Sequence, residues 1–108
     1  MQLKKYEPRY KKGIFDLTKK YGADVAHLEY LLQHSEATIL LMFNKKNKLR
    51  GFIAGIPKED DFYVLYCIGK TKEETTEFMK FVKLNLGEKY NSVVIFDHKH
   101  KIYHKEEI

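Results

Sequence analysis

Three apolar segments, separated by short polar breaks, occupy the middle of the chain. The segments Thr38–Phe43, Leu49–Ile56 and Phe62–Ile68 are rich in aliphatic, β-branched and aromatic residues, which favours extended strands. The breaks at 44–48 and 57–61 are polar and contain asparagine or proline, which is typical of turns. Connections this short join antiparallel neighbours, because a parallel return needs a crossover of about a dozen residues or more. The pattern therefore predicts a three-stranded antiparallel meander.

The region before the meander shows helical spacing. Gln2–Tyr6 is predicted to be a short edge strand, whose lysines discourage pairing with other chains. Apolar residues at intervals of four, three and four then predict a helix that ends at Gly22. This stripe consists of Tyr10, Ile14, Leu17 and Tyr21. Asp24 is a good N-cap for a second helix. The inward face of that helix is expected to contain Val25, Leu28, Leu31 and Leu32.

The region after the meander predicts a third helix and another strand. Thr71 and Glu74 have the spacing of a capping box at a helix start, and Gly87 is expected to end that helix. Its inward face is expected to consist of Phe78, Phe81, Val82 and Leu86, with Met79 beside it. Ser92–Phe96 predicts a buried strand. A polar tail follows, with Ile102 and Tyr103 as its only large apolar pair.

The element order is therefore β-α-α-β-β-β-α-β, followed by a short tail. A helix between two strands at the end of this order predicts a parallel crossover beside the meander. We expect an α/β fold, or α+β in the looser sense. Its sheet is expected to be mixed and mostly antiparallel, with helices on both faces. The whole chain, 1–108, is expected to form a single domain.

Composition narrows the class of protein. Apolar residues make up 44% of the 108, which is enough for a packed core, and no apolar run approaches the roughly 20 residues of a membrane span. The N-terminal segment lacks the apolar core of a signal peptide. The lone Cys67 excludes an intramolecular disulfide and argues against a zinc site built on thiolates. These features predict a cytoplasmic protein with no membrane partner.

The net charge of +5 raises the question of a nucleic-acid partner. The positive charge is almost all lysine, scattered along the chain, and arginine occurs only at Arg9 and Arg50. Arginine is the usual bidentate reader of phosphates and of guanine. We therefore interpret the lysines as a solvated surface and expect no nucleic-acid partner.

With these elements in place, the chain resembles the GCN5-related N-acetyltransferase (GNAT) superfamily. ILLMFNKKNKLRGFIAGI is similar to the second and third strands of that family, with a glycine-led third strand at Gly51–Gly55. FYVLYCI is similar to its fourth strand and SVVIF to its fifth. Ile102–Lys105 is similar to the family's Leu-Tyr-Glu-Lys segment. The resemblance implies a GNAT-like fold that is degenerate and shortened at the C-terminus.

The resemblance also implies a cofactor and its site. In that family the fourth strand pairs with the pantetheine arm of acetyl-CoA, which falls here on Tyr66, Cys67 and Ile68. The next loop binds the pyrophosphate with amides at a helix start, where the dipole favours anions. The residues expected there are Gly69, Lys70, Thr71 and Lys72. Tyr103 matches the tyrosine that often protonates the departing thiolate. The implied activity is acetyl transfer to an amine on a small molecule or a protein.

The loop departs from the family pattern R/Q-x-x-G-x-G/A. Glu73 stands at the arginine position, and Thr76 and Phe78 stand at the glycine positions. The sequence also ends before two strands that the family normally adds, so an exposed sheet edge is expected. These departures favour a second hypothesis, a non-catalytic interaction module that pairs through this edge with a protein partner or a second copy of the chain.

Four potential metal ligands cluster after the last predicted strand. They are Asp97, His98, His100 and His104. Their spacing does not match the usual metal motifs, so we interpret them as part of a solvated tail and expect no metal.

Overall fold

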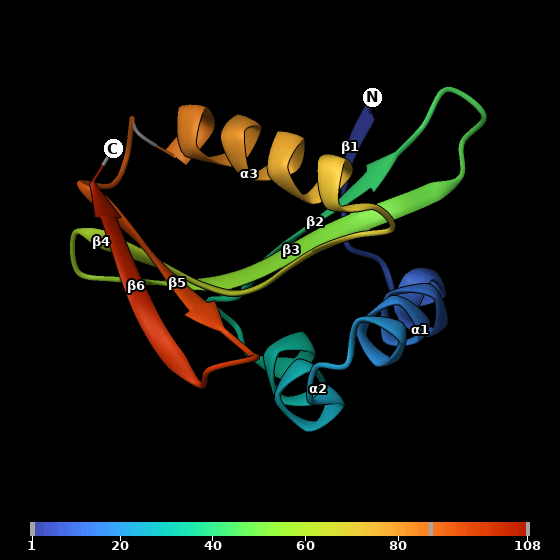
Figure 1. Ribbon diagram of the computed structural model, residues 1–108, viewed down its shortest axis with the longest axis horizontal. Helices are drawn as coiled ribbons and strands as arrows, with labels where there is room; N and C mark the ends of the chain where they lie inside the picture. The colour runs from blue at the N-terminus through green and yellow to red at the C-terminus, as the bar shows by residue number, and fades with distance from the viewer. Residues whose placement is uncertain (1, 87, 108) are drawn as a thin grey trace.

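The computed structural model describes residues 2–86 and 88–107, which form one six-stranded sheet and three α-helices (Figure 1). The elements follow the chain as β1 (Gln2–Lys5), a 3-10 helix (Pro8–Tyr10), α1 (Lys11–Tyr21), α2 (Val25–Gln33), β2 (Thr38–Phe43), β3 (Leu49–Lys58), β4 (Asp61–Gly69), α3 (Lys72–Leu86), β5 (Ser92–Asp97) and β6 (Ile102–Glu107). No described helix combines the length and the apolar character needed to cross a membrane.

The strands lie in the sheet in their order along the chain, β1-β2-β3-β4-β5-β6. β4 and β5 pair in parallel, and every other neighbouring pair in the described part of the chain is antiparallel. The parallel pair requires a crossover, and α3 supplies it. α3 covers one face of the sheet, and α1 and α2 cover the other (Figure 1). The predicted mixed, mostly antiparallel sheet with helices on both faces is confirmed.

The C-terminal tail is a correction to the sequence prediction. Instead of remaining a solvated tail, the chain turns back after Asp97 and forms β6, which pairs antiparallel with β5. The Asp97 carbonyl accepts a hydrogen bond from the Lys101 amide (2.7 Å), and Lys101 has a left-handed φ of 58°. This strand was not predicted because backbone pairing with β5, and not an apolar side-chain pattern, stabilises it. Its two large apolar side chains, Ile102 and Tyr103, are about half exposed.

Three predictions about helix ends are confirmed. Gly22 ends α1 with a φ of 92°, which a glycine adopts without a Cβ penalty. The Asp24 carboxylate caps α2 by accepting a hydrogen bond from the Ala26 amide (2.8 Å). The Thr71 hydroxyl caps α3 by accepting one from the Glu74 amide (3.1 Å). The predicted end of α3 at Gly87 lies outside the described residues.

The inward faces of the helices are mostly as predicted. The stripe residues that are buried are Ile14, Leu17, Leu28, Leu31, Phe78 and Val82. The prediction is wrong for two residues, because Tyr21 is 57% exposed and Phe81 is 44% exposed. Tyr21 is the last residue of α1. Phe81 lies on the flank of α3, because Phe78 and Val82, one turn apart, take the positions that face the sheet.

The sheet separates two apolar clusters, and β4 contributes to both. Phe62 and Val64 pack on the α3 side, whereas Tyr66 and Ile68 pack on the side of α1 and α2. Residues two apart in a regular strand share one face, so the alternation must be interrupted. The register shows the interruption: Gly55 of β3 pairs with Val64 and Ala54 pairs with Tyr66, which leaves Leu65 as the extra residue of a β-bulge.

Candidate functional site

β4 and β5 pair only over their first four residues and then separate. The ladder ends at Val64 and Ile95, although β4 continues to Gly69 and β5 to Asp97 (Figure 1). A cleft of about 500 Å³ lies beside this separation, between α3 and the β5–β6 hairpin. This volume is within the usual range of a small-molecule site.

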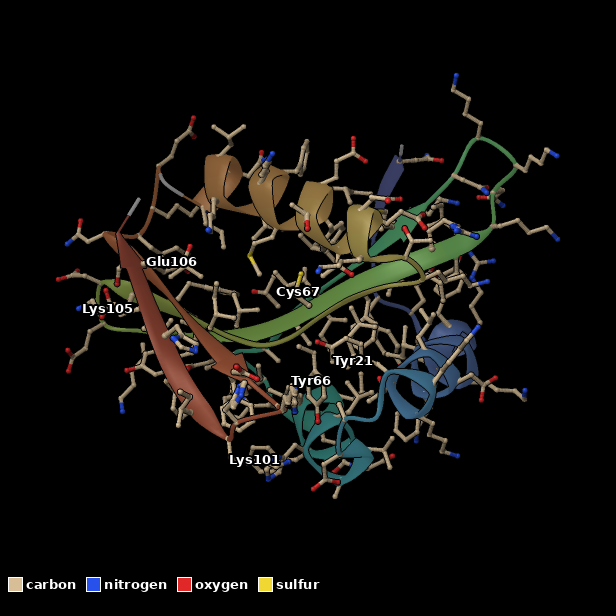
Figure 2. The ribbon with its side chains drawn as sticks, in the orientation of Figure 1. Tyr21, Tyr66, Cys67, Lys101, Lys105 and Glu106 are labelled. Atoms are coloured by element: carbon tan, nitrogen blue, oxygen red, sulfur yellow. The ribbon has the colours of Figure 1, made fainter. Side chains whose placement is uncertain are left out.

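The cleft opens through the plane of the sheet. Cys67 and Ile95 line it from the α3 cluster, and Ile68 lines it from the cluster of α1 and α2. Figure 2 shows the underlying alternation, with Cys67 on the α3 side of β4 and its neighbour Tyr66 directed toward α2. A flexible chain lying in this opening would therefore run beside the backbone of β4.

His98 lies at the point where the two strands separate. Its Nε2 is 2.6 Å from the carbonyl oxygen of Leu65, the bulged residue. Its ring stacks on Tyr66 (centroids 4.7 Å apart) and meets Phe96 edge-on (4.8 Å). The sequence interpretation assigned His98 to a solvated tail, and the structure places it in the cleft lining. The available signal was the period of two of β5, which, continued one residue past the end of the strand, puts Phe96 and His98 on one face.

The predicted residues of the pantetheine arm lie at the cleft in different ways. Cys67 and Ile68 line it, whereas Tyr66 is buried behind it and its hydroxyl donates to the carbonyl of Asp24. Burial raises the pKa of Tyr66 to about 12. Burial also raises the pKa of the Cys67 thiol to about 12, against the opposing effect of Lys83. Cys67 is therefore a wall of the cleft and not a thiolate nucleophile.

Two of the four amides in the predicted pyrophosphate loop, those of Gly69 and Lys70, are hydrogen-bonded within the protein. The Gly69 amide donates to the Thr75 hydroxyl (2.9 Å), and the Lys70 amide donates to the Arg50 carbonyl (2.8 Å). The amides of Lys72 and Glu73 fall in the first turn of α3, where the helix offers them no carbonyl. The anion-binding capacity of this loop therefore rests on fewer amides than a glycine-rich loop would present.

Arg50 and Glu74 form a bidentate ion pair beside this loop. Arg50 Nε and Nη2 lie 2.7 and 2.6 Å from the two carboxylate oxygens of Glu74. The hydrogen bond from Arg50 lowers the pKa of Glu74, and the same bond raises the pKa of Arg50. The pair joins β3 to the start of α3 and holds the guanidinium away from other anions.

The residues at the family's glycine positions have structural roles here. Thr76 lines the cleft, and its hydroxyl donates to the carbonyl of Lys72 (3.1 Å). Phe78 is 1% exposed and lies in the α3 cluster. On α3, Lys80 and Lys83 line the cleft, and Lys83 forms an ion pair with Glu106 of β6.

Tyr103 lies next to the cleft but is not among its lining residues. Its ring is 55% exposed and lies 4.9 Å from the ring of Phe96, which does line the cleft. It also meets Tyr63 of β4 edge-on, with centroids 6.0 Å apart. This packing connects β6 to β4 and β5 on the face opposite α3.

The cluster of potential metal ligands is divided by the hairpin. His100 Nδ1 lies 2.8 Å and His104 Nε2 lies 3.7 Å from Asp97 Oδ2, whereas His98 points to Leu65. The hydrogen bond from His100 lowers the pKa of Asp97 to about 2. Across residues 2–86 and 88–107, no group of three His, Cys, Asp or Glu side chains is arranged to hold a metal ion.

Solved structures share this fold. The aminoglycoside 6'-N-acetyltransferase from Enterococcus faecium matches with a TM-score of 0.69 and 13% identity, over 88% of this chain and 60% of its own. An aminoglycoside 6'-N-acetyltransferase complexed with coenzyme A matches with a TM-score of 0.65 and 14% identity, over 91% of this chain and 64% of its own. Tetrahymena GCN5 matches with a TM-score of 0.71 and 12% identity, over 94% and 74%.

These matches show that the chain has the GNAT fold, as the sequence resemblance predicted. The chain spans less than two thirds of the length of the two aminoglycoside acetyltransferases. No protein-family model and no curated protein sequence matches the chain.

Proposed function

We propose that this chain is an acetyltransferase that binds acetyl-CoA in the cleft between β4 and β5 and transfers the acetyl group to an amine. The observation that carries the proposal is the separation of the two parallel strands, which leaves an opening through the sheet beside the β4 backbone. The fold shared with acetyltransferases supports it. The acceptor class we propose is an amine on a small molecule or a protein.

The cleft fits the pantetheine arm of acetyl-CoA. The arm is a flexible chain with amide groups and aliphatic segments. The walls formed by Cys67, Met79 and Ile95 suit the aliphatic part. Beyond Val64 the β4 backbone has lost its pairing with β5, and past Leu65, whose carbonyl contacts His98, its amide groups suit the arm's amides. Acetyl-CoA would supply the acyl carbon activated by a thiolate leaving group.

The phosphate end relies on lysine more than on loop amides. Lys70 and Lys72 are exposed at the start of α3, and Lys80 lines the cleft further along the helix. Lysine binds phosphate as a point charge and gives less geometric specificity than a glycine-rich loop. We therefore propose that Gly69, Lys70, Thr71 and Lys72 hold the pyrophosphate weakly.

Glu74→Gln is expected to tighten acetyl-CoA binding. Glutamine keeps the capping-box spacing, but it removes the charge that holds Arg50, and a freed guanidinium can bind phosphate. We expect about a tenfold lower Kd, the equivalent of one net charged hydrogen bond. Glu73→Gln is the matched control, because it removes the neighbouring charge without freeing Arg50. Equal affinities for the two variants would contradict this role of Glu74.

Tyr103 is the proposed proton donor to the departing thiolate. Tyr103→Phe keeps the aromatic packing on Phe96 and removes only the hydroxyl. We expect the acetyl-transfer rate to fall by about 100-fold, the lower end of general acid–base effects, with acetyl-CoA binding unchanged. Tyr63→Phe on the neighbouring ring serves as the control. A rate for Tyr103→Phe equal to that of the wild type would leave Tyr103 as a packing residue only.

The proposal is tested by calorimetric titration of the purified protein with acetyl-CoA, followed by an assay of acetyl transfer to a panel of amines. We expect a Kd in the micromolar range, about −8 kcal/mol at 1 μM. Coenzyme A is the control ligand, and the difference between its Kd and that of acetyl-CoA gives the contribution of the acetyl group to the affinity. The absence of heat at millimolar acetyl-CoA would reject the proposal.

A second function is favoured by two observations: the amides of Gly69 and Lys70 are hydrogen-bonded within the protein, and Phe78 is buried. In this second function the chain keeps the fold, binds no pyrophosphate and acts as an interaction module. The partner we propose in that case is a protein or a second copy of the chain, pairing with an edge strand, β1 or β6. Dimerisation in analytical ultracentrifugation without acetyl-CoA binding would favour this function.

A further inference from the structure

His98 is held in the cleft by contacts with β4 and β5. The Leu65 carbonyl fixes one ring nitrogen, and the ring lies between Tyr66 and Phe96. A ring held by stacking and by a hydrogen bond keeps one orientation, which a surface histidine does not. The Leu65 carbonyl reaches the ring because the bulge turns it out of the regular ladder.

The hydrogen bond determines which nitrogen of His98 is basic. A backbone carbonyl only accepts, so Nε2 must donate its N–H to Leu65 O. In the neutral ring the lone pair then resides on Nδ1. A histidine whose one nitrogen is bound to a carbonyl while the other carries the lone pair is arranged to accept a proton.

The other titratable groups of the cleft are less suited to this role. Cys67 is a thiol, the lysines at 80 and 83 are donors, and Tyr21 is an exposed phenol at the end of α1. Asp97 accepts hydrogen bonds from His100 and from the amides of the β5–β6 turn. His104 lies on β6 with its Nε2 toward Asp97.

We propose that Nδ1 of His98 accepts the proton that the acceptor amine loses during acetyl transfer. This inference rests on the proposed function. As the amine nitrogen bonds to the acyl carbon, its N–H proton passes to His98 Nδ1, and the C–S bond electrons leave with sulfur. The thiolate takes a proton from the Tyr103 hydroxyl, and the imidazolium returns its proton to the tyrosinate through solvent. His98 therefore adds a catalytic residue in the turn that follows β5.

The first test reads the tautomer without any ligand. In ¹⁵N-labelled protein, long-range proton–nitrogen spectra distinguish a protonated ring nitrogen from one with a lone pair. His98→Gln identifies the His98 signals by their loss. We expect the neutral form of the ring to carry its hydrogen on Nε2 and its lone pair on Nδ1. The opposite tautomer, or rapid averaging of the two, would overturn the proposal.

The second test measures transfer and binding separately. His98→Gln keeps a donor of similar reach toward Leu65, and we expect it to reduce acetyl transfer by about 100-fold while acetyl-CoA binding is unchanged. Imidazole in solution is expected to restore part of the activity of His98→Ala. His27→Gln, which changes an exposed histidine of α2, is the matched control.

The outcomes separate this inference from the proposed function. Transfer by His98→Gln at the wild-type rate, or loss of transfer only in His104→Gln, would overturn the role of His98 and leave the acetyltransferase proposal intact. Tighter acetyl-CoA binding by His98→Gln with faster transfer would show that the ring blocks the arm, which also overturns it. A wild type that neither binds nor transfers would reject the proposed function itself.

Discussion

Replacing Gly55 by alanine is expected to destabilise the protein by about 3 kcal/mol, the upper end of overpacking effects. A Cβ at this position would fall on the carbonyl oxygen of Tyr63 and within 2.6 Å of the Phe62 ring. The oxygen belongs to the backbone of the neighbouring strand, so the contact is relieved only by moving β4 at its bulge. The free energy of unfolding in urea measures the effect.

The matched control for this substitution is Gly13→Ala in α1. There the new Cβ meets only the tip of the Leu49 side chain, at 2.9 Å, and alanine favours the helix by about 1 kcal/mol. We expect the stability of this variant to change by no more than about 1 kcal/mol. If Gly55→Ala changed the free energy of unfolding by as little as Gly13→Ala, the bulge would not depend on this close approach of β3 and β4.

Phe78→Ala is expected to destabilise the protein by about 3–5 kcal/mol, as for other buried aromatic residues. Phe78 is 1% exposed and packs in the α3 cluster with Ile53, Val64 and Val93. In the sequence resemblance, Phe78 stands at a position where the GNAT family carries glycine. A glycine at this position would therefore restore the family's loop pattern only by removing a core side chain between α3 and the sheet.

Phe81→Ala provides the comparison within the same helix. Phe81 is 44% exposed on the flank of α3, so the same truncation is expected to cost about 1 kcal/mol or less. Thermal or urea unfolding of both variants gives the difference directly. Similar losses for the two would mean that α3 packs with another face toward the sheet.

The elements that the sequence predicted are those whose signals are local. The meander follows from alternating apolar runs and polar turns, and the helix ends at Gly22, Asp24 and Thr71 follow from backbone chemistry within one turn. These signals do not depend on distant partners. The same reasoning explains why the inward positions Ile14, Leu28 and Phe78 are buried as predicted.

The elements that the sequence did not predict depend on contacts between distant segments. β6 is a strand because β5 offers it an edge, and its side chains are mostly polar and exposed. The bulge at Leu65 is visible only in the register of β4 against β3. The carbonyl of Leu65 holds His98 in the cleft, and this contact could not be predicted from the polar composition of the tail.

The candidate site was predicted only through the family resemblance. The structure brings Cys67 and Ile68 to the cleft, places Tyr103 beside it, and shows Thr71 as the cap of α3. The cofactor contacts of these residues stay predictions. Spacing alone did not indicate them, because the cleft forms where two strands distant in sequence separate.

Acetyl-CoA binding in the cleft is measured most directly by a titration of ¹⁵N-labelled protein with acetyl-CoA, followed by two-dimensional amide NMR. We predict saturable shifts confined to the walls of the cleft, at 65–72 in β4 and the loop, 75–83 in α3, and 95–98 in the end of β5 and the turn after it. Unchanged spectra at millimolar acetyl-CoA, or shifts gathered at another surface, would contradict acetyl-CoA binding in this cleft.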